Sequence, residues 1–379
     1  MEVAVDDVKE LVRRDLERLE PSAGGLEKTL RLVRRRERNR RVSAAAAGLV
    51  LMVGLAVGLW VSLGPRQRQP VGHVSPTPTP VSAGPRLFLA GDGEMWVVDV
   101  ATGSVSHVVL PELSSGDPPY RIVRRGDKLV LWGSTATYVL DPATDGPPRG
   151  LIDGSLIFIP SATPDRVWVG SGRPGELSAV SEVAVDGTVT VPDTKPPGGL
   201  WPVAALEAGL VFPTPDGQLE VWDPLTGEVI RRLPGVFPVA TYGNTLAWCP
   251  STCETLHLTN VVTGKELEVA PPPGTYGFQA FAGAFSPDGK TIAVPVYTDS
   301  KLMNEELALV DVEAGTATRV EGTTSEGYVY VDWAPSGEAV FISSGERFAE
   351  RSIIEYQLGA GSATRLPVEV GDFYGMAAA

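Results

Sequence analysis

The stretch AFSPDGKTIAVPVY, Ala284–Tyr297, decides the fold. Apolar residues stand on both sides of a central Ser-Pro-Asp-Gly-Lys turn, so the stretch predicts two strands joined by a tight connection. A related turn, APSGE, occurs at Ala334–Glu338, and shorter copies occur at Thr163–Asp165 and Thr214–Gly217. The copy at Thr214 is displaced, because it leads directly into the strand that ends at Asp223. A turn that recurs along the chain indicates an internal repeat.

A second recurring pattern is a short apolar strand, then Asp or Asn, then a turn that ends in Gly. Its seven strands end at Asp99, Asp141, Asp186, Asp223, Asn260, Asp311 and Leu358. An Asp or Asn side chain accepts hydrogen bonds from backbone N–H groups ahead of it, and Gly takes a positive φ. The pattern therefore predicts a turn at the end of each of these strands.

Taken together, the two patterns give a unit of strand, turn, strand, loop, strand, Asp-turn and strand. Gly126-Asp127 and Gly243-Asn244 supply the first turn in two further units. Four strands in roughly 40 to 50 residues correspond to one blade of a β-propeller. Residues 86–379 are therefore predicted to form an all-β, seven-bladed β-propeller.

A propeller must close its ring, and the first unit supplies only three strands, at about 86–90, 94–99 and 104–109. The C-terminal piece Gly371–Met376 aligns with the innermost strand predicted at Tyr328–Trp333. We expect it to complete blade one by pairing beside Arg86–Ala90, which removes two open sheet edges.

The repeat resembles the seven-bladed propellers of the WD40, TolB-like and YVTN types. The resemblance covers residues 86–379 and rests on the turns at 286–290 and 334–337 and on Trp222-Asp223 with Thr226-Gly227. Only one copy has Trp-Asp, and no unit opens with Gly-His. The layout of a short Arg-rich tail, an anchor and an outer propeller is similar to that of bacterial single-pass envelope proteins.

The anchor is predicted from Val42–Leu63, a run of 22 residues without a charge. As a helix it would extend roughly 33 Å, enough to cross a hydrocarbon core of about 30 Å. Six arginines lie within Arg34–Arg41 before the run, and only Arg66 and Arg68 follow it closely. Because basic flanks stay in the cytoplasm, we expect an uncleaved single-pass signal-anchor with a cytoplasmic N-terminus and an extracytoplasmic C-terminal domain.

The regions around the anchor give three further expectations. Residues 1–41 predict a basic, amphipathic helical tail, and residues 64–85 a Pro/Thr-rich linker. Gly54 and Gly58 have the spacing that lets two membrane helices approach, which is a weak argument for a homodimer. Residues 86–379 carry 18 basic and 37 acidic residues, so nucleic acid is not expected as a partner.

The candidate site residues are few. Cys249 and Cys253 lie where the tip between the second and third strands of blade five is expected, and outside the cell they favour a disulfide. The three histidines, His73, His107 and His257, have no spacing typical of a metal site or a catalytic triad. We therefore assign no catalytic, cofactor-binding or metal-binding residue and expect no cofactor. The aromatic residues Tyr120, Tyr276 and Tyr328 lie near expected blade boundaries, where either packing or a binding face would explain them.

These observations leave three functions open. The first is a membrane-anchored, extracytoplasmic and non-catalytic module that binds an unknown protein or a cell-envelope glycan. The second is a transmembrane signalling or regulatory protein whose cytoplasmic tail binds a partner. The third is a propeller hydrolase, for example a lactonase, since propellers can gather catalytic groups in their channel. Converging polar groups at the channel mouth would distinguish a ligand site from simple packing.

Overall fold

The computed structural model describes residues 85–379, except residues 92, 236, 303 and 369 and the segments 111–120, 134–135, 145–146, 154–156, 174–175, 326–327, 345–351 and 371–372. The tail predicted at 1–41, the membrane span at 42–63 and the linker up to residue 84 lie outside these residues. Among the residues described, the only helical element is the 3-10 turn η1, Pro197–Gly199, and no helix is long and apolar enough to cross a membrane.

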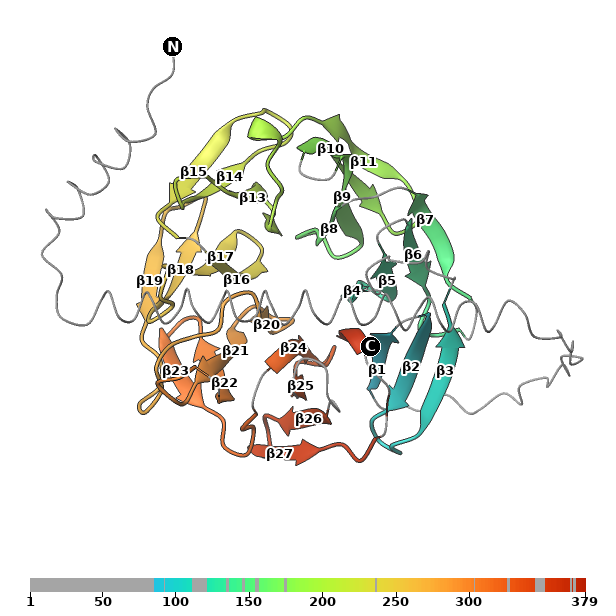
Figure 1. The fold of residues 1–379 in the computed structure, drawn as a ribbon, viewed down its shortest axis with the longest axis vertical. Helices are drawn as coiled ribbons and strands as arrows, with labels where there is room; N and C mark the ends of the chain where they lie inside the picture. Colours follow the sequence, from blue (N-terminus) through green and yellow to red (C-terminus); the bar gives the residue numbers. More distant parts are fainter. Residues whose placement is uncertain are drawn as a thin grey trace, which may run out of the picture. The chain divides into compact units, whose positions relative to one another are not determined.

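Seven four-stranded antiparallel sheets surround a central axis and form a seven-bladed β-propeller (Figure 1). The strands of each blade are given from the innermost outward. Blade one consists of β28 (Phe373–Ala378), β1 (Arg86–Gly91), β2 (Glu94–Asp99) and β3 (Val105–Val109), and blade two of β4 (Arg121–Arg125), β5 (Lys128–Trp132), β6 (Ala136–Leu140) and β7 (Arg149–Asp153). Blade three consists of β8 (Ile157–Pro160), β9 (Arg166–Arg173), β10 (Glu176–Ala184) and β11 (Val189–Thr194), and blade four of β12 (Ala204–Leu206), β13 (Gly209–Pro213), β14 (Leu219–Trp222) and β15 (Val229–Leu233).

The last three blades follow the same order. Blade five consists of β16 (Phe237–Tyr242), β17 (Thr245–Cys249), β18 (Leu256–Asn260) and β19 (Glu266–Val269). Blade six consists of β20 (Ala284–Phe285), β21 (Thr291–Tyr297), β22 (Glu305–Asp311) and β23 (Thr316–Arg319), and blade seven of β24 (Tyr328–Trp333), β25 (Ala339–Ser344), β26 (Ser352–Gln357) and β27 (Ser362–Arg365). The prediction of seven blades is confirmed.

The ring closes through the C-terminal strand, as predicted. Strand β28 pairs antiparallel with β1, with Leu87 opposite Ala378 and Leu89 opposite Met376. Beyond the strand, Arg86 and Ala379 exchange two backbone hydrogen bonds of 2.9 Å. Blade one is therefore built from both ends of the propeller sequence, and neither side of β1 is left as an open edge (Figure 1).

The turns at the ends of the third strands have the predicted chemistry. Asp223 Oδ1 accepts a hydrogen bond from the Leu225 N–H at 2.8 Å, and the Gly227 N–H donates to the Asp223 carbonyl at 2.8 Å. Asn260 and Asp311 cap their turns with side-chain oxygens in the same way. Gly227 has a φ of 76°, in the left-handed region that favours glycine.

The other predicted turns join first and second strands. Gly126, Pro164, Gly243, Pro287 and Pro335 all lie in such connections. The copy at Thr214–Gly217 is displaced as expected, because it joins β13 to β14, the second and third strands of blade four. Each turn between a first and a second strand lies near the axis of the ring, where the innermost strand of its blade ends.

The apolar core is divided among the interfaces between blades. One cluster combines Leu87 and Phe373 of blade one with Phe341 of blade seven, and another combines Phe88 of blade one with Leu129 of blade two. Each blade buries both of its faces against its neighbours, which explains the nearly continuous apolar runs in the second and third strands. This packing fixes the inner strand ends around the axis.

Candidate functional site

A cavity of about 630 Å³ opens at the centre of the ring, where the innermost strands end. Blades two to seven all contribute to its wall, which we call the channel mouth. The polar and aromatic part of the lining consists of Arg124, Arg125, Ser161, Glu207, Thr241, Tyr242, Phe285, Asp332 and Trp333. A concave site with a few converging polar groups has the general form of a ligand site.

Charged side chains of both signs line this wall. Arg124 and Arg125 come from the end of β4, Glu207 follows β12, and Asp332 lies near the end of β24. The Glu207 carboxylate accepts a hydrogen bond from Asn244 Nδ2 at 3.0 Å. Within the residues that the structure describes, the Arg124 guanidinium forms no hydrogen bond and no ion pair, so it is available to a ligand.

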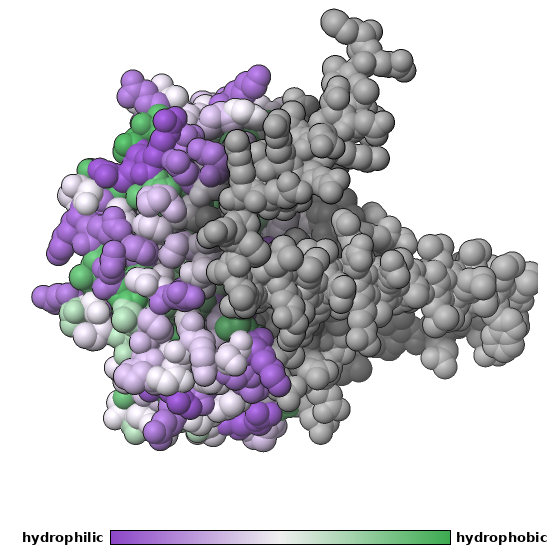
Figure 2. Space-filling view, turned by 60° about the vertical axis from the view of Figure 1, so that its left-hand side comes forward, coloured by the Kyte–Doolittle hydropathy of each residue, from purple (hydrophilic) through white to green (hydrophobic). Residues whose placement is uncertain are grey.

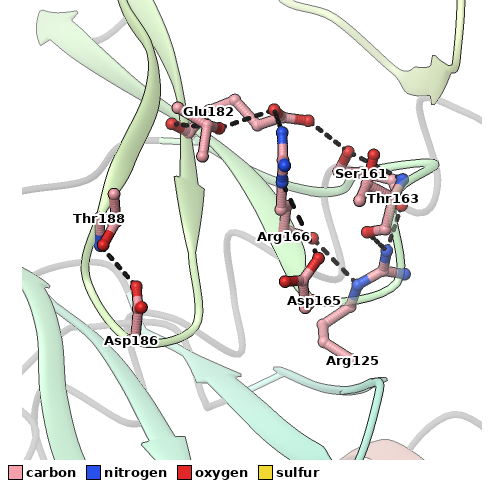
Figure 3. A network of polar contacts seen from close by, with 9 residues as sticks. Arg125, Ser161, Thr163, Asp165, Arg166, Glu182, Asp186 and Thr188 are labelled. Carbon is pink, nitrogen blue, oxygen red and sulfur yellow. Dashed lines mark hydrogen bonds and ion pairs between the residues drawn. The ribbon is translucent and has the colours of Figure 1, made fainter.

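Arg125 has a different role, because its guanidinium is hydrogen-bonded to blade three. It donates to the carbonyl oxygens of Arg166, at 3.0 Å from Nε, and of Ser161 and Thr163 (Figure 3). Burial lowers the pKa of Arg125 to about 10, against the opposing effects of Asp165 and Glu182, so the group stays charged at neutral pH. Arg125 thus connects blade two to the first turn of blade three and positions Arg124 beside it.

The blade-three side of this contact is itself a closed polar network. Ser161 Oγ donates to Glu182 Oε1 at 2.6 Å, and Arg166 Nη1 lies 3.1 Å from Glu182 Oε2 (Figure 3). Thr190 Oγ1 donates to the same Oε2 at 2.7 Å. Because the Glu182 carboxylate is satisfied within its blade, this wall of the mouth is rigid.

Asp332 lies on the opposite wall and connects two blades. Its Oδ1 accepts from the Trp333 N–H at 2.9 Å, and its Oδ2 accepts from the Ala378 N–H of β28 at 2.8 Å. Burial raises the pKa of Asp332 to about 6, against the two backbone hydrogen bonds and the charge of Arg124, which lower it. A carboxyl group with a raised pKa in a cavity is typical of a functional site.

The aromatic part of the wall includes the accessible ring of Tyr242, whose side chain is 44% exposed. Its hydroxyl donates to the Pro287 carbonyl at 3.3 Å, and its ring lies 5.7 Å from that of Phe285. On the neighbouring blade, Trp333 Nε1 donates to the Ala284 carbonyl at 2.9 Å. The two hydrogen bonds fix Tyr242 and Trp333 and leave the Tyr242 ring as a contact surface.

The cysteine pair lies elsewhere, between β17 and β18 as predicted. Cys249 and Cys253 are both buried and are free thiols in the structure. A hydrogen bond with Cys253, together with burial, raises the pKa of the Cys249 thiol. The Cys253 carbonyl accepts from the Phe278 N–H at 2.9 Å, which fixes the turn against the next blade. The disulfide remains a prediction.

The residues considered from sequence are not brought together by the fold. His107 lies in β3 and His257 in β18, and neither lines the channel mouth. Tyr276 is 52% exposed on the connection between β19 and β20, Tyr328 begins β24, and Tyr120 lies outside the described residues. The candidate site is therefore made of residues that the sequence analysis did not select, although the first turns it recognised mark the strand ends that form the mouth.

One group in the described residues has the donor set of a metal site: His257, Glu266 and Glu268, on the outer strands of blade five. Spacing along the chain does not reveal this group, because its members come from two strands. Strand pairing places Glu268 directly opposite His257, and the predicted hairpin between these strands carries that signal.

Comparisons with known proteins give only low-scoring structural likenesses. No family model matches the chain, and no curated protein matches it. Among solved structures, the chain is similar to a chain of the mitotic checkpoint complex, with a TM-score of 0.47 and 14% identity, covering 74% of this chain and 93% of that one. It is also similar to TolB from Acinetobacter baumannii, with a TM-score of 0.46 and 15% identity, covering 77% of this chain and 81% of that one. A third similar structure is apo AztD from Citrobacter koseri, with a TM-score of 0.44 and 14% identity, covering 78% of this chain and 98% of that one. At these scores and identities the likenesses carry no argument about this chain.

Proposed function

We propose that this protein is a membrane-anchored, extracytoplasmic and non-catalytic binding module whose propeller receives a protein segment or a cell-envelope glycan at the channel mouth. The observation that carries the proposal is the convergence of polar side chains from five blades, the second to fifth and the seventh, on one cavity of about 630 Å³. The anchoring part rests on the uncharged run Val42–Leu63 and the arginines before it.

The chemistry of the mouth indicates what kind of ligand it would hold. Arg124 offers unused donors, Glu207 and Asp332 offer acceptors, and the exposed ring of Tyr242 offers an apolar contact. A polar chain with both donors and acceptors, such as a peptide loop or an oligosaccharide, satisfies all three. A purely apolar ligand would cover the Arg124 guanidinium without accepting a hydrogen bond from it, which is costly.

The test is photo-crosslinking of the full-length chain in its native cells. A photoreactive phenylalanine analogue at Tyr242 should give a discrete crosslinked product that stays with carbonate-washed membranes, and the change Arg124→Ala should reduce that product at least several-fold. The matched control is the same analogue at Tyr276, which is comparably exposed but outside the mouth.

The product also identifies the ligand class, since protease digestion shortens a protein adduct and glycan hydrolases shorten a glycan adduct. Two results would overturn the proposal: the same product from both positions, or no product from Tyr242. Recovery of the chain in the carbonate-soluble fraction would overturn the anchoring part alone.

A further inference from the structure

The imidazole of His257 is held rigidly on the outer part of blade five. Its ring stacks on the indole of Trp248 in the neighbouring strand, with centroids 4.2 Å apart and planes 13° apart. Trp248 is itself fixed, because its Nε1 donates to Thr259 Oγ1 at 2.9 Å. The His257 side chain is 14% exposed, so only one edge of the ring reaches the surface.

Two carboxylates meet this edge from the outermost strand, β19. Glu268 pairs directly with His257 in the ladder, and Glu266 pairs with Thr259 two residues further along. Because alternate residues of a strand share a face, both glutamates lie on the same face as the imidazole. His257 Nδ1 lies 2.9 Å from Glu266 Oε1, and one ligand atom from each of the three residues lies within 4.8 Å of the others.

The two negative charges of this cluster are not balanced by a basic side chain. In the part of the chain that the structure describes, no lysine or arginine forms an ion pair with Glu266 or Glu268. Two adjacent carboxylates repel each other, and a cation between them relieves that repulsion. This side of the ring is largely hydrophilic at its surface, so water and ions have access to it (Figure 2).

The cluster can reach the geometry of a coordination sphere by small side-chain movements. Ligand atoms at about 2.0 to 2.2 Å from one ion lie roughly 3 to 3.5 Å from each other. The 2.9 Å contact between His257 and Glu266 must therefore open slightly, and Glu268, whose ligand atom lies within 4.8 Å of the other two, must turn toward them. One imidazole nitrogen and two carboxylate oxygens suit zinc and related divalent transition metals, with water in the remaining position.

We propose that His257, Glu266 and Glu268 form a binding site for one divalent transition-metal ion, with zinc as the preferred probe, that joins the two outer strands of blade five. The site is separate from the channel mouth, and the inference does not depend on the proposed function.

The chain contains a matched control. His107 in β3 also lies near a tryptophan, Trp96, with ring centroids 6.2 Å apart, and near one carboxylate, Glu94, at 3.5 Å. Among the described residues no second carboxylate joins this pair, and its ring contact is T-shaped instead of stacked, so it reproduces a histidine–glutamate pair without the metal geometry. If replacing His107 weakened zinc binding as much as replacing His257, the binding would be nonspecific.

The experiment is titration of the chelator-treated full-length chain with zinc chloride, followed by calorimetry, and with cobalt chloride, followed by visible absorption. We expect one zinc ion per chain and a cobalt spectrum with nitrogen and oxygen ligation. The changes His257→Gln, Glu266→Gln and Glu268→Gln should each weaken binding at least tenfold, whereas His107→Gln and His73→Gln should leave it unchanged.

Folding of each variant is checked by its unfolding midpoint without metal, and zinc should raise the midpoint of the unmodified chain but not that of His257→Gln. The proposal is overturned if the unmodified chain shows no saturable binding. It is equally overturned if His257→Gln binds zinc as well as His107→Gln does.

Discussion

At the scale of single residues, Asp332 makes the stability of the ring depend on pH. Its folded pKa of about 6 lies above the usual value of 3.8, so the folded state binds its proton more tightly than the unfolded state does. The stabilisation from that proton is fully present below about pH 4 and is lost as the pH rises through 6. The change Asp332→Asn removes this titration, so the variant should not lose this stabilisation as the pH rises. The free energy of unfolding of the variant, minus that of the unmodified chain, should therefore increase between pH 4 and 7.

The size of this gain is at most about 3 kcal/mol, and less where water in the cavity screens the charge. Asparagine loses one of the two acceptors that Asp332 offers, but that loss does not vary with pH. Urea unfolding at several pH values measures the difference. Asp288→Asn is the control, since hydrogen bonding to Ser286 lowers the pKa of Asp288 and places its titration below the window. Parallel pH profiles for Asp332→Asn and the unmodified chain would contradict the prediction.

This property of Asp332 could not be predicted from the sequence, where it is one polar residue in the strand YVYVDW. Its pKa depends on the burial supplied by neighbouring blades and on the Ala378 N–H, 46 residues away along the chain. Arg124 is similar: it resembles any exposed strand residue until blades two to seven are assembled around the axis. Local sequence carries no information about such long-range neighbours.

At the scale of single elements, the Asp-turns are local and were predictable. Asp311 accepts hydrogen bonds from the N–H groups of Glu313 and Ala314, at 2.9 and 2.8 Å, within three residues. Blade five performs the same capping with Asn260, and blade seven has Leu358 in the equivalent region and closes its turn through backbone bonds alone. The side-chain bonds therefore stabilise the turn but are not required to form it.

Asp311→Ala should lower the free energy of unfolding by about 1 kcal/mol, because two N–H groups lose an acceptor and turn to water. Asp311→Asn should cost clearly less, since Asn260 shows that an amide oxygen suffices at this position. Urea unfolding followed by tryptophan fluorescence measures both. Equal losses for the two variants would show that the charge, and not the capping oxygen, stabilises the turn.

At the scale of the whole molecule, the repeat allowed the number of blades and the closing strand to be predicted, because both follow from counting strands. The cavity could not be predicted in the same way. Its lining combines residues from Arg124 to Pro335, and blades two to seven each contribute only the end of the first strand and the following turn. The repeated turns fix where these ends meet, while the side chains placed there differ from blade to blade and have no shared pattern.

Closure of the ring is the feature on which every other contact depends, and it can be removed cleanly. A chain that ends at Val370 lacks β28 and leaves β1 with β2 as its only partner. Five of the six residues of β1 are buried in the closed ring, so the uncovered edge is apolar and able to pair with other chains. We expect the truncated chain to elute as aggregates in size-exclusion chromatography in detergent, whereas the full-length chain elutes as a defined species.

Gly375→Ala is the graded control, because it keeps β28 but disturbs its contact with blade two. An added Cβ would lie 2.7 Å from the Ile122 nitrogen and 3.1 Å from the Arg121 Cα, so the neighbouring strand must move. This variant should remain unaggregated and show a lower unfolding midpoint. If the truncated chain also remained unaggregated, β28 would not be what protects β1, and the ring would have to hold through the contacts between blades that do not involve β28.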